Sequence, residues 1–121
     1  MQTRHLKFGL LGESKAVDYL IKKKYQIVER NWKLKKYEID IIAIDNEELV
    51  FIEVKTRSSS LQQLGEIITK SQQKRIISAA DSFIKENKID LDVRFDMILI
   101  EKTIKSYKFT HNKEKIFPTF D

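Results

Sequence analysis

The chain has 121 residues, of which 41% are hydrophobic and 34% are charged. This length is typical of one domain, and the hydrophobic content is enough for a modest core, so we expect a single domain over residues 1–121. The absence of cysteine excludes disulfide bonds and thiolate metal sites, and two histidines, His5 and His111, argue against a structural zinc site. Any metal ion would be held by oxygen ligands.

The N-terminal segment lacks the apolar run of a signal peptide, and no stretch approaches the roughly 20 apolar residues of a membrane span. We therefore expect a cytoplasmic protein that does not enter a membrane. The formal net charge of +5 and the pI of about 9.3 favour a polyanionic partner such as nucleic acid. Charge alone does not establish that partner, because many basic proteins bind no polyanion.

Two segments have hydrophobic residues at helical spacing, residues 8–24 and 65–86. The first ends in a run of lysines, which suits the C-terminus of a helix. We expect a helix over each segment, with a loop at residues 56–63 before the second. The expected apolar positions are Leu10, Val17, Leu20 and Ile21 in the first helix and Ile76, Ile77, Ala80, Phe83 and Ile84 in the second.

The remaining apolar segments are predicted to be strands, and the polar run DNEE joins the second of them to the third as a turn. The resulting order, α-β-β-β-α-β, predicts an α/β fold in which a mixed sheet is flanked by helices. A short edge strand is a further candidate, before a poorly defined tail from about residue 111. The predicted strands cover residues 25–31, 37–44, 49–54 and 94–100, and the candidate edge strand covers residues 107–110.

Charged residues interrupt the apolar strands of this predicted hairpin. Alternation puts Glu38 and Asp40 on the face that also carries Ile42, and it puts Glu53 and Lys55 together on one face of the next strand. If the turn is centred in DNEE, Asp40 lies directly opposite Glu53, and Glu38 lies opposite Lys55. The other face of the second strand would carry Ile39, Ile41 and Ala43.

Two carboxylates opposed in this way repel each other, so a positive group should lie between Asp40 and Glu53. Hard oxygen ligands favour Mg²⁺ or Mn²⁺. Lys55 lies about 6.6 Å along the strand from Glu53 and would engage a phosphate bound at the metal. The set is typical of phosphodiester hydrolysis. The plain alternative is that Glu53 and Lys55 are solvent-exposed and that Asp40 pairs with a basic neighbour.

Glu13 is a weaker fourth candidate, because it stands within the apolar stripe of the first helix and a carboxylate there needs a partner. It would serve either as a metal ligand or as a carboxylate that positions water. The alternative is a structural Glu13 paired with Lys15 or another nearby base, and the sequence does not decide between them.

Basic and amide side chains at the start of the second helix, together with one arginine after Lys55, are candidates for contacts with a DNA backbone. A solvated basic helix face explains the same pattern. We expect Asp96 to be structural, paired with Arg94 or at the sheet edge, and Trp32 to serve in packing. The candidate nucleic-acid contacts are Arg57, Lys70, Gln72, Gln73, Lys74 and Arg75.

The assembled residues resemble the PD-(D/E)XK nuclease signature, with Asp40 as its first acidic residue and Glu53-Val54-Lys55 as its ExK element. More closely, the chain resembles the YraN-like family of small bacterial proteins, which are classed as endonucleases from their motif. ExK alone is a weak signal, but the combination of runs is specific and reaches to about residue 100. The matching runs are GLLGESKAVDYL, YQIVERNW, EIDIIAID, LVFIEVKTR, AADSFI and RFDMILI.

This resemblance implies a restriction-endonuclease-like fold related to archaeal Holliday junction resolvases. It also implies that Glu13 joins the metal site, that the backbone carbonyl of Val54 is a ligand, and that a homodimer is compatible with the fold. The chain departs from the family pattern at Tyr37, where glycine is usual, and at Gln72, near where lysine is common. These departures leave the acidic residues intact but affect expected substrate contacts.

The sequence therefore favours a Mg²⁺-dependent DNA endonuclease, with branched or flapped DNA in repair or recombination as its candidate substrate. One rival is a nucleic-acid-binding protein that keeps the nuclease fold without cutting. Another is a protein-interaction subunit that does neither. The set of Asp40, Glu53 and Lys55 argues against both rivals, since a pure binder has no need of opposed carboxylates.

Overall fold

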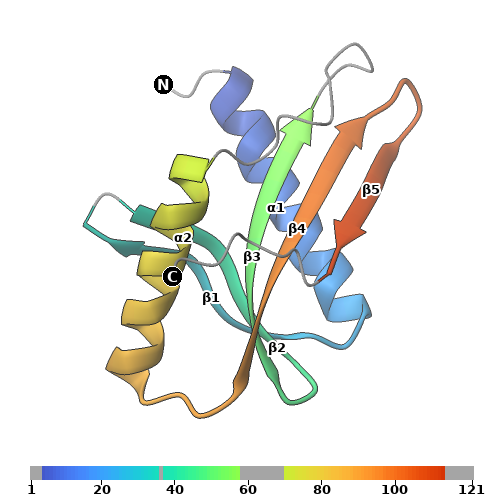
Figure 1. Ribbon diagram of the computed structural model, residues 1–121. Helices are drawn as coiled ribbons and strands as arrows, with labels where there is room; N and C mark the ends of the chain where they lie inside the picture. The colour runs from blue at the N-terminus through green and yellow to red at the C-terminus, as the bar shows by residue number, and fades with distance from the viewer. Residues whose placement is uncertain (1–3, 36, 58–69, 114–121) are drawn as a thin grey trace.

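The computed structural model describes residues 4–35, 37–57 and 70–113, with side chains from residue 11 onward. The described chain folds into two helices and five strands (Figure 1). The helices are α1 (Arg4–Lys22) and α2 (Lys70–Asn87), and the strands are β1 (Gln26–Leu34), β2 (Tyr37–Asp45), β3 (Glu48–Arg57), β4 (Asp92–Lys102) and β5 (Tyr107–Asn112).

The strands form one sheet in the order β1-β2-β3-β4-β5. All neighbours are antiparallel except β3 and β4, which run parallel, and α2 lies in the connection between these two strands. A parallel pair requires such a long crossover, whereas antiparallel neighbours need only a short turn. The predicted α/β fold with a mixed, helix-flanked sheet is confirmed, and β5 completes it.

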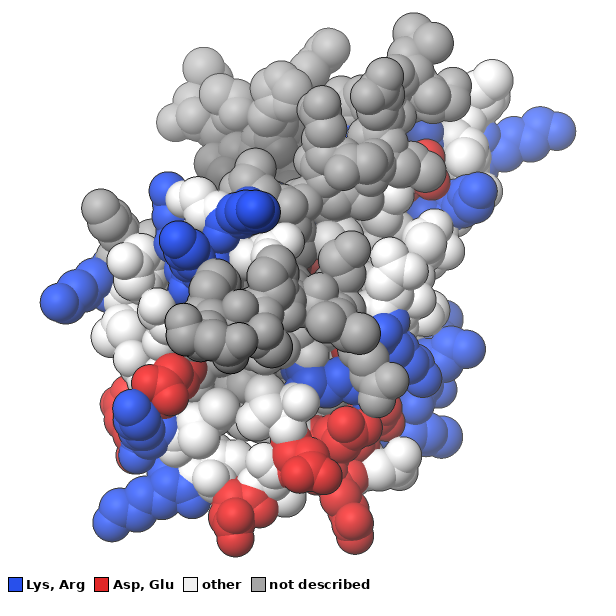
Figure 2. All heavy atoms as spheres, in the orientation of Figure 1, with Lys and Arg blue, Asp and Glu red and all other residues white. Residues whose placement is uncertain are grey.

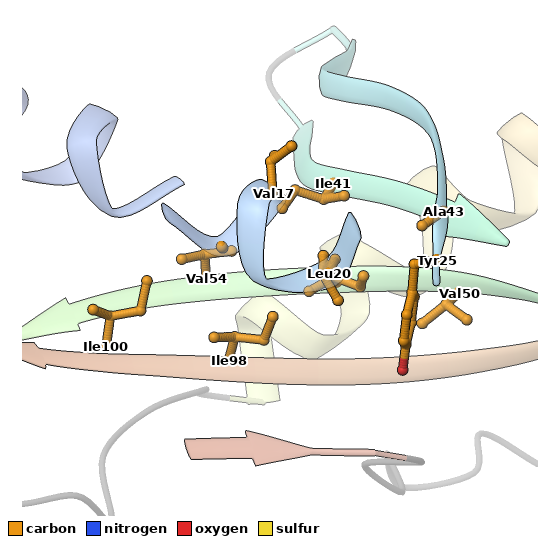
Figure 3. Packing of buried hydrophobic residues seen from close by; sticks show 11 residues of the cluster. Val17, Leu20, Tyr25, Ile41, Ala43, Val50, Val54, Ile98 and Ile100 are labelled. Atoms are coloured by element: carbon orange, nitrogen blue, oxygen red, sulfur yellow. The ribbon is translucent and has the colours of Figure 1, made fainter. Parts of the chain in front are cut away.

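Each helix covers one face of the sheet, so the strands have a core on both sides (Figure 1). On the α1 side, Leu20 lies among side chains of β2, β3 and β4, and the Tyr25 hydroxyl lies at the margin (Figure 3). Burial on both faces explains the nearly continuous apolar runs of β3 and β4. The α1-side core includes Ala16, Val17, Ile41, Ala43, Val50, Ile52, Val54, Ile98 and Ile100, and the α2-side core includes Ile39, Ile42, Leu49, Phe51, Ala79, Ala80 and Phe83.

Both helices end in the same way, with a lysine in the left-handed conformation. Lys24 has a φ of 73°, and the N–H of Tyr25 donates to the carbonyl of Leu20 at 3.0 Å. Lys88 has a φ of 52°, and an equivalent bond of 3.0 Å joins the Ile89 N–H to the Ile84 carbonyl. These bonds are those of a Schellman motif, which usually has glycine at the left-handed position.

A buried polar network fixes the end of the sheet near the β2–β3 turn. Arg94 donates to Asp96 through Nε at 2.8 Å, to Tyr25 at 2.7 Å, and to Asp45 and Glu48 at 2.9 and 3.0 Å. The guanidinium therefore has partners on β2, β3 and β4 as well as on the segment after α1. A buried charge is tolerated only when it is paired in this way. The predicted pairing of Asp96 with Arg94 is confirmed.

Some predicted boundaries and faces were wrong. Thr56 and Arg57 belong to β3 rather than to a loop, because β4 pairs with β3 as far as Arg57. Ile21 is 53% exposed, since the apolar stripe of α1 is narrower than expected. The expected tail begins too early, because His111 lies in β5. Residues 58–63, residues 65–69 and the side chain of Leu10 lie outside the described part. In that described part, neither helix is long and apolar enough to span a membrane.

Gly12 lies where α1 is in close contact with β3. A Cβ atom built on Gly12 would collide with Cγ2 of Thr56 on β3. Thr56 has little freedom to move away, because a β-branched side chain on a strand is stiff at χ1. The missing side chain at residue 12 therefore sets how closely the N-terminal half of α1, including Glu13, lies to β3.

We predict that Gly12→Ala lowers the free energy of unfolding by about 1–3 kcal/mol, because the added methyl overpacks this contact. Thr56→Ser removes Cγ2 and should restore most of the loss in the double variant. Chemical denaturation of the two single variants and the double variant measures this coupling. Additive losses in the double variant would show that the Gly12–Thr56 contact does not set the helix position.

Candidate active site

The strands β2 and β3 separate at one end of their hairpin. Their pairing runs from Asp45↔Glu48 to Ile41↔Ile52, in the register predicted from the turn. Beyond Ile52, β3 stays paired with β4 as far as Arg57, while β2 stays paired with β1 as far as Tyr37. The sheet is therefore forked between β2 and β3, and the next residues along the two arms are Asp40 and Glu53. The predicted strand pairs Asp40–Glu53 and Glu38–Lys55 are not formed, because the pairing ends one step before them.

The backbone of β2 is irregular at Asp40. Ile41 packs in the α1-side core, but Ile39 packs in the α2-side core, although strict alternation would place both on one face. The prediction that Ile39 shares a face with Ile41 and Ala43 is therefore wrong. On β1, Asn31 lies opposite Asp40 and has a φ of 51°, a left-handed conformation that asparagine tolerates.

Asp40 fills the gap that the fork opens. The N–H of Val54 donates to Oδ2 of Asp40 at 2.8 Å, where a continuous sheet would supply a backbone carbonyl of β2. Burial, and after it the charge of Glu53, raises the pKa of Asp40 to about 7, and the bond from Val54 opposes this rise. The side chain is thus anchored by backbone and held close to a second carboxylate.

Glu53 and Lys55 project from β3 at the same fork. Burial raises the pKa of Glu53, while the neighbouring Lys55 lowers it. The Lys55 Nζ lies 3.6 Å from Oε1 of Glu53, and the side chains are 21% and 18% exposed. Glu53 and Lys55 are therefore mostly buried and are not solvent-exposed strand residues, as the plain alternative supposed.

Glu13 approaches the fork from the α1 side. Burial, followed by the charges of Asp40 and Glu38, raises the pKa of Glu13 to about 7, against the effect of a hydrogen bond with Asn31. Its Oε1 atom is buried and has no hydrogen-bond partner among the described residues. Lys15, one partner in the structural alternative, instead places its Nζ 4.3 Å from the ring centroid of Tyr107, while the charge of another nearby base, Arg30, lowers the pKa of Glu13.

Glu38 was noted on the correct strand but was not predicted as a site residue. Its charge contributes to the raised pKa of Glu13, Asp40 and Glu53 alike, so it lies near all three carboxylates. Together with Glu53 it lines a hollow of about 140 Å³ that α2 closes from the other side. The residues of α2 in this hollow are Gln72, Arg75 and Ile76.

The chemistry of this donor set fits a divalent cation. Four carboxylates influence one another here, and Lys55 is the ammonium that lowers the pKa of Asp40 and Glu53. No three His, Cys, Asp or Glu side chains of the described chain converge as a ready-made metal cluster. Mg²⁺ does not require one, because it binds through one or two carboxylates and keeps several waters. Asp40 and Glu53 are sufficient for that mode, and Glu13 adds a buried oxygen on the α1 side, close enough to Asp40 for their charges to interact.

Two of the predicted nucleic-acid contacts, Gln72 and Arg75, line the hollow beside Glu53. Arg57 follows Lys55 on β3, and its Nη1 donates to the Thr56 carbonyl at 2.9 Å. Figure 2 shows basic side chains over the first half of α2, and acidic side chains at the opposite end of the molecule, near the β2–β3 turn. The exposed basic residues at the start of α2 are Lys70, Lys74 and Arg75, and Gln72 and Gln73 between them are half-buried.

Comparison with known proteins identifies the family. The model of the uncharacterised protein family UPF0102 matches residues 12–100, which include every residue of the fork. The chain belongs to UPF0102. A UPF0102 protein of Bacteroides fragilis is 40% identical over 115 residues, covering 94% of this chain and 95% of the relative. Relatives from Bacteroides thetaiotaomicron and Alkaliphilus oremlandii are 40% and 39% identical, with coverage of 94% and 87% of this chain and 95% and 93% of the relatives.

We predict that Asp40 makes the stability of this UPF0102 protein depend on pH. An acid whose pKa is raised on folding stabilises the fold below its unfolded pKa, near 3.8, and this contribution is lost as the pH rises through about 7. Asn at this position stays neutral. The free energy of unfolding of the wild type should therefore fall, relative to Asp40→Asn, by at least about 1 kcal/mol between pH 4 and pH 7.5.

Urea denaturation of both proteins at several pH values measures this difference. Parallel pH profiles for the wild type and Asp40→Asn would contradict the raised pKa.

Proposed function

We propose that this UPF0102 protein is a Mg²⁺- or Mn²⁺-dependent endonuclease that hydrolyses DNA phosphodiester bonds. The observation that carries the proposal is the meeting of Asp40, Glu53 and Lys55 at the fork between β2 and β3. A separation of strands that serves only packing would not need two mutually repelling carboxylates. Their burial costs stability, and a bound cation offsets that cost.

Each site residue predicted from the sequence has a role in this proposal. Asp40 and Glu53 would hold the cation, with the backbone carbonyl of Val54 as a further ligand. A divalent cation at this position supplies Lewis-acid polarisation of the scissile phosphate. Lys55 stabilises negative charge that develops on the phosphate oxygens. Glu13, whose pKa of about 7 suits proton exchange near neutral pH, orients or deprotonates the attacking water.

The basic start of α2 supports DNA as the substrate. Arg75 and Gln72 line the same hollow as Glu38 and Glu53, so a phosphate held by Arg75 lies next to the fork. Contacts of this kind supply affinity without reading sequence. The preference for branched or flapped DNA in repair or recombination, and a homodimer as the active form, are proposed from the resemblance to junction resolvases.

We predict that Asp40→Asn and Lys55→Met reduce Mg²⁺-dependent cleavage of branched or flapped DNA by at least about 100-fold, because each removes a group that acts at the reacting phosphate. Both variants should keep their affinity for DNA. The matched control is Lys85→Gln, which removes one charge from an exposed ion pair with Asp81 on α2.

The double variant Lys74→Gln/Arg75→Gln should show the opposite pattern, with the loss in DNA affinity rather than in cleavage. This double variant should weaken DNA binding and lower the slope of log K against log [salt] by about 1.8 for duplex DNA. If Asp40→Asn cuts as fast as the wild type, the fork is not the catalytic site. If no substrate is cut and only the α2 variant changes DNA binding, the protein is a non-catalytic binder.

A further inference from the structure

A second hollow lies on the side of α1 that is turned towards β5. Its volume is about 280 Å³, twice that of the hollow beside Glu53, and it contains no residue assigned to the fork. The positions on α1 are spaced as one face of a helix, and β5 supplies the opposite wall. We call it the α1–β5 groove; it is lined by Lys15, Asp18, Tyr19, Lys22 and Phe109.

The aromatic rings of the α1–β5 groove are fixed in place. Tyr19 and Phe109 stack with their centroids 5.2 Å apart and an interplanar angle of 21°. The Tyr19 hydroxyl lies 3.0 Å from Nδ1 of His111, and Nε2 of His111 lies 2.7 Å from a buried oxygen of Asp96. Because the Asp96 carboxylate only accepts, Nε2 donates to it, and Nδ1 lies within hydrogen-bond distance of the Tyr19 hydroxyl. The hydrogen bonds from Asp96 through His111 thus orient the Tyr19 ring.

Lysines lie near these rings and near Tyr107, which precedes Phe109 by two residues on β5. Nζ of Lys15 lies 4.3 Å from the ring centroid of Tyr107, and Nζ of Lys23 lies 5.8 Å from that of Tyr19. Lys22 is exposed at the groove, whose lining contains one acidic residue, Asp18. Positive charge beside preorganised aromatic surface is the combination that binds a polynucleotide with exposed bases.

We propose that the α1–β5 groove binds a single-stranded segment of DNA. Bases of a duplex are stacked inside the helix and cannot reach an aromatic ring without being flipped out. In a single strand the bases are free to stack on Phe109, while the backbone phosphates meet Lys15 and Lys22. A protein or small-anion ligand would use the lysines but would not require the stacked rings.

This inference rests on the proposed nuclease function and extends it to the substrate. The fork reaches α1 at Glu13, in the middle of the helix, and the groove lies along its C-terminal half, on the flank facing β5. If α2 holds a duplex and the groove holds a single strand, the protein prefers DNA that contains a duplex and a single-stranded segment. The groove is thereby the feature that favours flapped or branched DNA over a continuous duplex.

The test measures the binding of a fluorescent 12-nucleotide oligo(dT) by anisotropy, in EDTA, at several salt concentrations. The double variant Lys15→Gln/Lys22→Gln should bind about tenfold more weakly at low salt, and its slope of log K against log [salt] should fall by about 1.4. The matched control is Lys85→Gln/Lys88→Gln, which removes two charges at the C-terminal end of α2 and should bind as the wild type does.

A second variant separates stacking from charge. Phe109→Leu should weaken binding of oligo(dT) about tenfold while leaving the salt slope unchanged. Thermal unfolding of each variant verifies that it is folded under the binding conditions. Should Phe109→Leu fail to fold, photo-crosslinking of an oligonucleotide containing 5-iododeoxyuridine to wild-type Tyr107 or Phe109 serves in its place.

Equal affinity of the groove variant and the control would overturn the groove assignment, as would tighter binding of oligo(U) RNA than of oligo(dT). Because EDTA removes divalent cations, neither result depends on hydrolysis, and the proposed nuclease would stand. Conversely, a protein that binds oligo(dT) through the groove but cuts no DNA would keep this site and overturn the proposed nuclease.

Discussion

The separation of β2 from β3 beyond Ile41 and Ile52 is the constraint on which the candidate site depends. A continuous sheet would satisfy the Val54 N–H with a backbone carbonyl, but the fork leaves it to the Asp40 carboxylate. Each arm remains paired with its outer neighbour, so the gap is held open by ordinary strand pairing. Carboxylates then reach the gap from both faces of the sheet, Glu13 from the side of α1 and Glu53 from the side that α2 covers.

The two ends of the same strands differ in how their charges are compensated. Near the β2–β3 turn, the Arg94 guanidinium has carboxylate partners and a tyrosine partner, so its charge is compensated within the protein. At the fork, the carboxylates outnumber the ammonium of Lys55, and the pKa values of Glu13 and Asp40 are raised to about 7. In the proposed function, a bound cation would compensate this negative charge, and the cation and Lys55 would in turn receive the phosphate.

Much of this structure was predictable from the sequence, because its elements are strongly periodic and the DNEE turn sets the hairpin register. The pairing of Asp96 with Arg94 was also correctly predicted, as was a packing role for Trp32, whose partner Phe83 only the structure shows. The reversal of Ile39 was not, since alternation assumes a regular strand, whereas Asn31 and Asp40 lie at an irregular point. Asparagine within a strand was the available signal. Glu38 was missed because its influence on three carboxylates depends on the fork, which local patterns do not reveal.

Isothermal titration with Mn²⁺ or Mg²⁺ at low salt tests most directly whether the fork binds a divalent cation. We predict that the wild type binds the cation with release of protons at neutral pH, since Asp40 must ionise. Binding should be lost in Asp40→Asn and in Glu53→Gln and retained in Arg75→Gln. Unchanged binding in Asp40→Asn, or no binding by the wild type with or without DNA, would contradict a metal site at the fork.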